Sequence, residues 1–291
     1  MSGFVICSKP GQLGNRLVLF SQFIAFAIEH GVSIVNLSFD EYAKYFRTTS
    51  EDALCRFPKR ESYLGNSKVI RRCLYWLAYC LARVMDRGLR LPGVKIISLD
   101  WSEGCDLDSP EVIDLVKKNK IVLAQGWGFR SKGIFYKHSQ AVRKHFALKE
   151  SHGACVERKI RELRNCCDVL IGAHIRQGDY RTFFDGKFYY ETEFYVGLMN
   201  RVATFFPGKK VMFMVCSNQT QDPGLFSSVD YQWGPGNPVE DMYALAECDY
   251  ILGPPSTFTM WASFYGRKPL YMVADPDKGP TLADFIPITD L

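Results

Sequence analysis

The sequence predicts an α/β protein built on parallel sheets, and three observations support this. An apolar strand at residues 3–7 leads through a glycine-rich turn and a helical pattern to a second strand at residues 32–37, which is typical of a parallel β-loop-α-β unit. A second alternation of strands and helices begins after residue 150. Its strands end in polar residues, where open α/β sheets bind ligands. We therefore expect two α/β halves, residues 1–150 and 151–291.

Composition narrows the class of protein. The chain has 291 residues, of which 47% are hydrophobic and 14% aromatic, and this excludes a disordered chain. The net charge of +5 fits an anionic small ligand or a membrane surface, and it is too small for a strong nucleic-acid footprint. Met1 leads almost directly into a strand, so we expect no signal peptide.

The ten cysteines favour a reducing compartment. No pair has metal-binding spacing, and five of them lie inside apolar segments, where a reduced thiol behaves as a small hydrophobe: Cys7, Cys73, Cys80, Cys216 and Cys248. With no signal peptide expected, these thiols predict a cytoplasmic protein.

The N-terminal half begins with the strand at residues 3–7 and a turn containing Gly11, Gly14 and Asn15. The turn resembles a dinucleotide-binding loop but lacks the full GxGxxG pattern, so we do not expect a nicotinamide or flavin cofactor. Leu17, Phe20, Ile24, Ala27 and Ile28 then recur at helical spacing, and Gly31 is a typical helix stop. Beyond residues 32–37 we expect further strands near residues 95–99 and 120–124.

An apolar segment at residues 73–82 has half the length that a membrane-spanning helix needs. Its flanks carry Arg71, Arg72, Arg83, Arg87 and Arg90. The favoured interpretation is a core helix with solvated basic flanks. The alternative is an interfacial helix that contacts anionic lipid, which predicts peripheral contact with the inner membrane face through residues 68–90.

The C-terminal half shows a regular alternation of elements. We expect helices at residues 155–164, 193–206, 238–248 and 254–266, and strands at residues 169–173, 211–216, 250–253 and 268–273. The carboxyl ends of parallel strands share one edge of the sheet, so the polar residues that follow these strands are expected to lie together.

Three strand ends in this half carry groups suited to an anionic ligand. Arg176 follows the first strand, and a guanidinium holds phosphate oxygens bidentately while staying charged at any working pH. Ser217 and Asn218 follow the second strand. Ser256 and Thr257 begin a helix, where free N–H groups attract anions. Ser256 alone is more typical of an N-cap, worth about 1 kcal/mol, but Arg176 on the same edge favours a ligand role.

Two residues beside Arg176 have open roles. His174 is either a buried histidine bonded to the backbone or a participant in catalysis. Asp179 either caps the turn after Gly178 or holds Arg176 in place, since both roles fit the spacing.

Two segments, Asp106 to Asp108 and Asp275 to Asp277, each resemble an Asp-x-Asp metal clip, and the second follows an apolar strand, as such clips do in metal-dependent sugar transferases. The short segment after Asp277 leaves too few residues for an acceptor domain, so we expect no metal. Among aromatic residues of the N-terminal half, Trp101, Trp127 and Phe129 are candidates for stacking on a sugar, although the core is the commoner place for such residues.

Three segments together resemble a known superfamily. They are Gly11-Gln-Leu-Gly-Asn-Arg-Leu17, His174-Ile-Arg-Gln-Gly-Asp-Tyr180 and the longer stretch from Asp241 through Ser256-Thr-Phe258 to Trp261. The chain is similar here to fucosyltransferases of the superfamily that includes family 11 α-1,2-fucosyltransferases, α-1,6-fucosyltransferases and protein O-fucosyltransferases. The second segment is similar to the superfamily's His-x-Arg-Arg-Gly-Asp-Tyr motif.

The resemblance implies a GT-B type fold, with two Rossmann-like halves facing across a cleft. It implies that residues 1–150 form the acceptor-side domain and that residues 151–291 bind GDP-fucose. The chemistry would be inverting and independent of metals and other cofactors, and the acceptor would be an oligosaccharide or polysaccharide. The residues implicated are Arg176 at the β-phosphate, Asp241, Ser256, Thr257 and Phe258 in donor binding, and Gly14 and Asn15 in a loop over the donor.

Two departures from the superfamily pattern concern the donor site. Gln177 stands where a second arginine is usual. Ser217-Asn218-Gln219 stands where Ser-Asp-Asp is common near the base and ribose, and an amide accepts guanine's N–H donors through its oxygen alone.

We therefore predict an inverting glycosyltransferase that moves fucose from GDP-fucose to a glycan hydroxyl, as α-1,2-fucosyltransferases do, with Arg176 neutralising the leaving diphosphate. If a general base acts, Asp179 and His174 are the nearest candidates. The alternatives are a GT-B transferase for another sugar nucleotide, a non-catalytic nucleotide-sugar or glycan-binding protein, and a membrane-surface adaptor.

Overall fold

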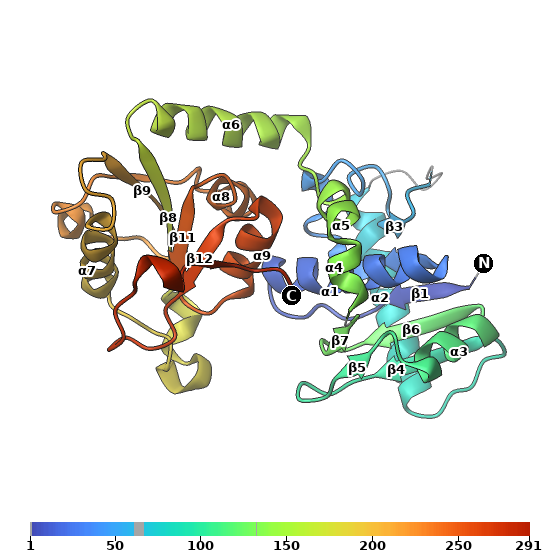
Figure 1. Ribbon diagram of the computed structural model, residues 1–291. Coiled ribbons are helices and arrows are strands. Elements are labelled where there is room, and N and C mark those ends of the chain that lie inside the picture. Colours follow the sequence, from blue (N-terminus) through green and yellow to red (C-terminus); the bar gives the residue numbers. More distant parts are fainter. Residues whose placement is uncertain (1, 61–66, 132) are drawn as a thin grey trace. The chain divides into compact units, whose positions relative to one another are not determined.

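The computed structural model describes residues 2–60, 67–131 and 133–291. The chain divides into two compact units, Met1–Glu150 (unit 1) and Ser151–Leu291 (unit 2), both of which contain a largely parallel sheet (Figure 1).

Unit 1 is built on a five-stranded sheet in the order β3-β2-β1-β6-β4. Its strands are β1 (Gly3–Ile6), β2 (Ser33–Asn36), β3 (Arg56–Phe57), β4 (Val94–Ser98) and β6 (Ile121–Gln125). All neighbours pair in parallel except β3, which is antiparallel to β2. The short strands β5 (Cys105–Asp106) and β7 (Phe129–Arg130) form a separate parallel pair.

Two helices cover opposite faces of this sheet because successive side chains of a strand point to opposite sides. On one face, α1 (Leu13–His30) packs Phe23 and Phe26 against Phe4, with ring centroids 5.0 and 5.6 Å apart. On the other, α2 (Lys68–Asp86) packs Ala82 and Met85 against residues that include Cys7 and Leu123. The remaining helices are α3 (Pro110–Lys118), α4 (Ile134–Lys137) and α5 (Ser139–His145), and η1 (Leu37–Phe39) and η2 (Ala43–Tyr45) are 3-10 turns.

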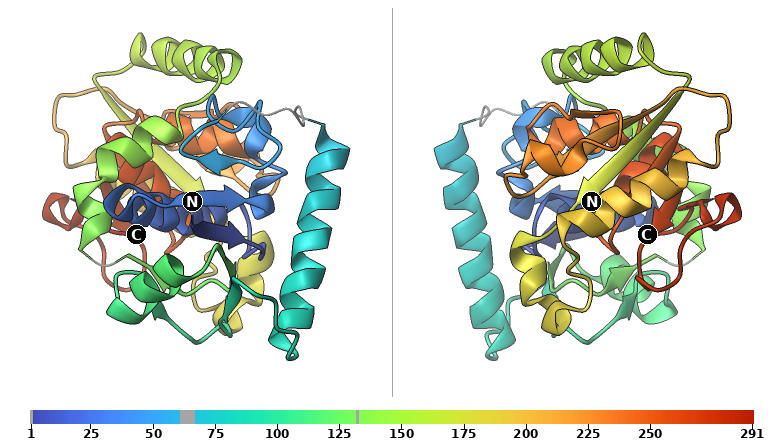
Figure 2. Two further views of the ribbon diagram at one scale, coloured as in Figure 1. Left: turned by 90° about the vertical axis from the view of Figure 1, so that its right-hand side faces the viewer. Right: turned by 90° about the vertical axis from the view of Figure 1, so that its left-hand side faces the viewer.

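The Arg-flanked segment forms the helix α2. The favoured interpretation of a core helix is wrong for this segment, because many side chains of α2 are exposed. Figure 2 shows α2 lying lengthwise along unit 1. Trp76 is 51% and Leu77 69% exposed, and Cys73 and Cys80 are exposed, so these thiols are not core hydrophobes as expected. The apolar content of α2 can be read from the sequence, but the exposure of its side chains depends on how many other elements pack against the helix.

Unit 2 contains a six-stranded sheet in the order β10-β9-β8-β11-β12-β13. Its strands are β8 (Val169–Ile175), β9 (Val211–Ser217), β10 (Tyr231–Trp233), β11 (Tyr250–Gly253), β12 (Pro269–Met272) and β13 (Ile286–Pro287), and all pair in parallel except β13. The chain winds outward from β8 through β9 and β10, then returns to add β11 and β12 on the other side. The strand order therefore reverses between β8 and β11.

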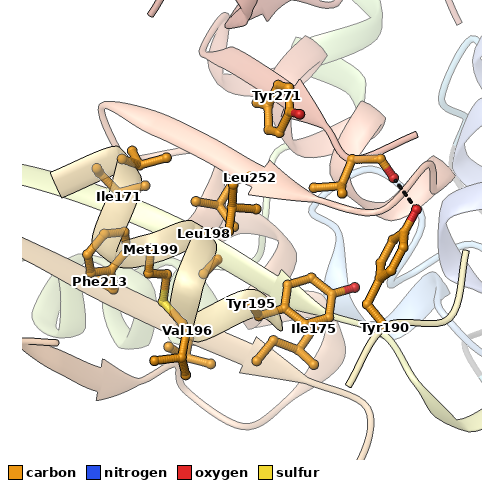
Figure 3. Packing of buried hydrophobic residues seen from close by; sticks show 14 of the residues in the cluster. Ile171, Ile175, Tyr190, Tyr195, Val196, Leu198, Met199, Phe213, Leu252 and Tyr271 are labelled. Atoms are coloured by element: carbon orange, nitrogen blue, oxygen red, sulfur yellow. Dashed lines mark hydrogen bonds between the residues drawn. The ribbon is translucent and has the colours of Figure 1, made fainter. Parts of the chain in front are cut away.

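Helices cover both faces of this sheet. On one face, α7 (Thr192–Ala203) packs Met199 beside Ile171 of β8 and Phe213 of β9 in the main hydrophobic cluster of unit 2 (Figure 3). The opposite face carries α8 (Pro238–Leu245) and α9 (Thr257–Gly266). There Gly172 leaves room for α8, because a Cβ at Gly172 would lie 2.5 Å from Leu245 Cδ2. The helix α6 (Glu150–Arg164) begins at the boundary between the units.

The predicted α/β class with two Rossmann-like halves is confirmed. Every strand expected in the C-terminal half is present within a few residues of its predicted bounds. The sequence did not predict β3, β5, β7, β10 or β13, which have two or three residues each and show no periodicity to detect. Within the described residues, no helix has the length and apolar character needed to cross a membrane.

Candidate active site

The candidate site lies where the strand order of unit 2 reverses, at the carboxyl ends of β8 and β11. At such a switch point the connections leave neighbouring strands in opposite directions, which opens a crevice for a ligand. The two strand ends approach closely at Gly253, where a Cβ would lie 3.0 Å from the main-chain oxygen of His174. Arg176 and Ser256 follow these two ends, so the topology brings together residues that are 80 positions apart in sequence.

Arg176 is held by two groups on different sides of its guanidinium. Its Nε and Nη2 donate to the two carboxylate oxygens of Asp179 at 3.1 and 2.6 Å. Its Nη1 donates to the hydroxyl of Ser256 at 3.3 Å. The side chain is 16% exposed, so the guanidinium is fixed in place yet reachable from solvent.

Ser256 is the N-cap of α9, the role that is typical of a serine taken alone at this position. Its hydroxyl accepts the N–H of Phe258 at 3.2 Å while receiving Nη1 of Arg176. The first turn of α9, which starts at Thr257, adds the partial positive charge of a helix N-terminus. The Nη1 edge of the guanidinium and the helix end therefore meet at Ser256, where both present donors to an anion.

Asp179 takes the second of the two roles considered from sequence, because it holds Arg176. The hydrogen bonds from Arg176 hold the pKa of Asp179 below its usual value, so this carboxylate is a weak base. Tyr180 supports the pair from the other side. The guanidinium carbon of Arg176 lies 4.7 Å from the centroid of the Tyr180 ring, and the Tyr180 hydroxyl donates to the main-chain oxygen of Pro255.

His174 lies buried behind the site. Its ring stacks on that of Phe258, with centroids 4.6 Å apart and an angle of 23° between the planes. Burial, and secondly the charge of Arg176, lowers the pKa of His174 to about 3, so the imidazole is neutral at physiological pH. Its Nδ1 is buried with no hydrogen-bond partner in the described part of the chain, which differs from the backbone-bonded histidine considered from sequence.

The end of β9 is tied to the same site by amide groups. Asn218 accepts the N–H of Gln177 at 2.9 Å through Oδ1, and its Nδ2 donates to Asp179 at 3.4 Å. Gly178 makes this approach possible, since a Cβ there would lie 2.8 Å from Nε2 of Gln219. Gln177, which replaces the expected second arginine, donates to the main-chain oxygen of Tyr190 at 3.1 Å. Gln177 therefore ties the loop to the fold and carries no charge into the site.

A pocket of about 500 Å³ adjoins this network between the ends of β9 and β10 and the start of α8. It is lined by residues that include Ser217, Gln219, Gln221, Trp233, Gly234 and Asp241. Asp241 accepts the N–H of Gly236 at 2.8 Å. Burial raises the pKa of Asp241 to about 6, with the charge of Glu240 adding to the rise while the Gly236 N–H opposes it.

Trp233 is a candidate site residue that was not identified from the sequence. It ends β10, is 37% exposed and lines the pocket together with Asp241. Its sequence signal is faint: an aromatic residue directly before Gly234 and Pro235, at the end of a strand of three residues.

Two predicted donor-binding residues, Gly14 and Asn15, belong to unit 1. They lie in the first turn of α1, and the preceding Gln12 makes no side-chain capping bond to this helix within the described residues. The structure thus brings together Arg176, Asp179, Asn218, Ser256 and Phe258, places Asp241 in the adjoining pocket, and leaves Gly14 and Asn15 at the beginning of another sheet's first helix.

The other residues considered from sequence lie apart from this site. Phe129 is fully buried in unit 1, so the core interpretation holds for it, whereas Trp101 is exposed. In both Asp-x-Asp segments the first carboxylate accepts the N–H of the second aspartate. Among the described residues, no group of three or more His, Cys, Asp and Glu side chains is arranged to hold a metal.

The arrangement can bind a ligand with an anionic group and a planar, hydrogen-bonding group. The anion would meet Arg176 and the start of α9, and the planar group would enter the pocket between Trp233 and Asp241. Asn218 connects the two parts, since it contacts Asp179 and follows the pocket residue Ser217.

Comparison with known proteins agrees with this topology. No protein-family model matches the sequence, and no curated protein matches it. Among solved structures, a mutant of Arabidopsis thaliana FUT1 in complex with GDP is similar, with a TM-score of 0.61, 12% identity and coverage of 94% of this chain and 70% of that one.

Two further structures are similar over nearly their whole length. POFUT1 in complex with GDP-fucose has a TM-score of 0.56 and 11% identity, with 91% of this chain and 93% of that one covered. The NodZ α-1,6-fucosyltransferase soaked with GDP-fucose has a TM-score of 0.54 and 15% identity, with 98% and 97% covered. The structural neighbours are fucosyltransferases, and the GT-B type fold expected from the sequence is confirmed.

Proposed function

We propose that this protein is an inverting glycosyltransferase that moves fucose from GDP-fucose to a hydroxyl of a glycan. The observation that carries the proposal is the position of Arg176, fixed by Asp179 at the switch point of unit 2 and directed at the start of α9. The adjoining pocket and a fold shared with proteins solved with GDP or GDP-fucose support it.

The chemistry requires stabilisation of a leaving diphosphate. As the bond from the sugar to the β-phosphate breaks, negative charge grows on the phosphate oxygens. Arg176 and the N–H groups at the start of α9 meet this charge without having to rearrange, and the loss of one such donor typically raises the barrier by about 2.7–4 kcal/mol. We assign this role to Arg176, with Ser256, Thr257 and Phe258 at the helix end.

Neither candidate base is suited to strong base catalysis. The pKa of Asp179 is lowered by Arg176, and that of His174 is lowered to about 3 by burial. We infer that both act as positioning residues: Asp179 orients the guanidinium, and His174 supports Phe258 at the start of α9. The bond to the diphosphate would then break ahead of attack by the acceptor hydroxyl. The sugar would carry positive charge in the transition state, and the hydroxyl would need little help from a general base.

The pocket contains groups that can recognise the guanine of the donor, although the end of β9 carries two amides where carboxylates would be expected. In the ionised form, Asp241 can accept the N–H donors of guanine, a role that Asn218 and Gln219 fill through their oxygens alone. Trp233 offers a ring face for stacking. We therefore assign Asp241, Trp233 and Ser217 to the donor base and ribose.

Several finer features belong to the same proposal. Unit 2 holds the donor, and unit 1 contributes to the acceptor side. Gly14 and Asn15 contact the donor through the uncapped first turn of α1, which is suited to an anion. The linkage is of the α-1,2 type made by family 11 enzymes, and no metal or other cofactor takes part, because Arg176 and the helix end supply the positive charge.

The chief alternative is a GT-B transferase for another sugar nucleotide. The amides at Asn218 and Gln219 favour it, since they suit a base with fewer N–H donors than guanine. A non-catalytic nucleotide-sugar-binding or glycan-binding protein would keep the pocket and bind a donor without turnover.

A thermal-shift panel with GDP, GMP, UDP, GDP-fucose and GDP-mannose tests the donor. A ligand at 100 times its dissociation constant stabilises a protein by about 2.7 kcal/mol. We expect GDP and GDP-fucose to raise the melting temperature most, and GDP-fucose alone to be hydrolysed slowly to GDP. Preference for UDP would contradict the assignment of guanine, and donor binding without hydrolysis or transfer to any glycan would favour the non-catalytic alternative.

We also propose that the protein works in the cytoplasm at the inner face of a membrane. Support comes from the exposed apolar side chains of α2, Val69, Trp76, Leu77 and Val84, and from Arg72 and Arg83 on the same helix. An apolar stripe bordered by arginines suits an anionic lipid surface.

Vesicle co-sedimentation tests this location. Vesicles with phosphatidylglycerol should bind the protein, and vesicles of phosphatidylcholine should bind it less. Leu77→Ser should weaken binding, whereas Ile286→Ser, at an equally exposed apolar side chain of unit 2, should not. Equal binding of both variants, or none by the unaltered protein, would contradict membrane contact through α2.

A further inference from the structure

The loop after β8 has an unusual backbone beside Arg176. It contains two 3-10 turns, η3 (Gly178–Arg181) and η4 (Phe183–Gly186). Phe184 and Asp185 have φ values of 47° and 54°, so two consecutive non-glycine residues are left-handed. L-residues rarely adopt this conformation, and such strain is concentrated where a loop serves a function.

The loop carries a continuous row of aromatic rings that starts at Arg176. Tyr180 lies against the guanidinium, with the guanidinium carbon 4.7 Å from the ring centroid. Phe183 stacks on Tyr180 at 5.3 Å and 26°, and Phe184 contacts Phe183 at 4.5 Å and 67°. Phe188 continues the row, with its centroid 6.3 Å from that of Phe184.

Exposure rises along this row from Tyr180 to Phe184 and is lower again at Phe188. Tyr180 is buried, Phe183 is 40% exposed and Phe184 is 64% exposed. The left-handed backbone at Phe184 fixes where its ring projects. The fold therefore presents apolar ring surface to solvent at the carboxyl edge of the sheet, where ligands of this topology bind.

We propose that Phe183 and Phe184 form a binding platform for a pyranose ring of the acceptor glycan. This inference rests on the proposed function. One face of a pyranose carries C–H bonds that pack on the negative face of an aromatic ring. Polar groups for sugar hydroxyls lie on the same loop: Arg181 donates to the hydroxyl of Tyr189 at 2.7 Å, and that hydroxyl donates to Glu191 at 3.0 Å.

The order of the rings favours the acceptor over the donor sugar. A donor sugar is bonded directly to the phosphate that Arg176 would face, so Tyr180 is the nearest ring to it. Phe184 lies two ring contacts farther out along the row. The surface of these few rings is also much smaller than the roughly 800 Å² per partner that a stable protein interface buries, so a sugar fits it better than a partner protein does.

Steady-state kinetics with separate readouts for donor and acceptor test the platform. An array of defined oligosaccharides, probed in the presence of GDP, identifies the acceptor to be used. Phe184→Ala should raise the acceptor KM about tenfold by loss of ring stacking. The affinity for GDP-fucose and its slow hydrolysis without acceptor should stay unchanged.

Matched variants separate the ring from the backbone. Phe184→Asn removes the ring but suits a left-handed residue, so it should match Phe184→Ala. Phe184→Trp keeps a ring and should retain the acceptor KM within about threefold. Ile286→Ala removes an equally exposed apolar side chain, on β13, and should change nothing.

Several results would overturn the inference. An unchanged acceptor KM in Phe184→Ala and Phe184→Asn would do so, and weaker GDP-fucose binding at an unchanged acceptor KM would assign the rings to the donor sugar. If the protein neither binds nor hydrolyses GDP-fucose, the proposed function fails, yet the array still tests the platform. Saccharide binding lost in Phe184→Asn would then support it, whereas an array with no bound saccharide would contradict it.

Discussion

Each unit has a buried or half-buried arginine in the segment that follows the first strand of its sheet, and the surroundings of the two arginines differ. In unit 1, Arg16 lies in the first turn of α1, pairs with Glu41 at 2.7 Å and donates to the main-chain oxygens of Ser38 and Gly11. In unit 2, Arg176 also pairs with a carboxylate, but its remaining donor faces Ser256 at a helix N-terminus.

This difference decides what each arginine can do. Both Nη atoms of Arg16 donate to main-chain oxygens, and its buried Nε has no hydrogen-bond partner among the described residues, which is the setting of a structural residue. On the Nη1 side of Arg176, the Ser256 hydroxyl and the N–H groups at the start of α9 can donate to a phosphate, whereas the Asp179 carboxylate is bound at Nε and Nη2. The same kind of ion pair is therefore placed to serve stability in unit 1, and we propose that it serves ligand binding in unit 2.

Arg176→Ala should have the largest effect. Loss of the guanidinium removes the charge that meets the leaving group, and transfer should fall about 100- to 1000-fold, as for the loss of one preorganised donor. Arg164→Ala is the matched control, since Arg164 makes the same kind of paired contact with Asp249 at the other edge of the sheet. Initial rates at saturating donor measure both.

If Arg176→Ala keeps more than about a tenth of the activity, the substitution has raised the activation barrier by less than about 1.4 kcal/mol. This result would remove Arg176 from the mechanism. A similar loss in Arg164→Ala would show that the effect comes from general destabilisation.

Asp179→Asn should come next, with kcat reduced about ten- to a hundredfold as the charged hydrogen bonds to Arg176 are lost. Because Arg176 holds the pKa of Asp179 below its usual acidic value, the carboxylate stays ionised around neutral pH in the native state. The pH–rate profile of the protein should therefore show no inflection from Asp179 between pH 5 and 8. An inflection there that disappears in Asp179→Asn would identify it as a base instead.

Arg16→Met should affect stability more than turnover. It leaves the main-chain oxygens of Ser38 and Gly11 without their donor and should lower the free energy of unfolding by about 1–3 kcal/mol. Denaturant unfolding measures this loss. If Arg16→Met instead abolishes transfer at unchanged stability, the contrast between the two arginines is wrong.

Asp241→Asn should have the smallest effect and a distinct pH signature. The pKa of Asp241 is raised to about 6, so the carboxylate is present above that pH and is lost as the pH falls through it. Guanosine affinity should therefore weaken below about pH 6 in the unaltered protein. In Asp241→Asn it should be weaker by about tenfold at pH 8 and independent of pH, as measured by calorimetry across that range. A pH dependence that survives the substitution would contradict this role.

The sequence predicts the part of the site that follows directly from long buried strands. The apolar run of β8 places Arg176 at a strand end, and the Pro-Pro-Ser-Thr segment places Ser256 at a helix start, so their meeting at one edge follows from parallel pairing. The role of Asp179 could not be chosen from sequence because a turn cap and an arginine partner have the same spacing.

Other parts depend on tertiary context. Trp233 ends a strand of three residues, too short for periodicity, and its exposure to the pocket is set by the position of α8. The left-handed backbone at Phe184 has no local signal, whereas Asp185 is of a residue type that tolerates this conformation and stands directly before Gly186. The exposed face of α2 was misjudged because apolar content does not show how many neighbours cover a helix.

Calorimetric binding of guanosine, GMP and GDP to the unaltered protein and to Arg176→Ala tests the central claim most directly, because it isolates the contact between the diphosphate and the guanidinium from catalysis. We predict that GDP binds the unaltered protein far more tightly than guanosine does, and that Arg176→Ala loses most of this difference while binding guanosine equally well. Equal affinity of both proteins for GDP would contradict the account.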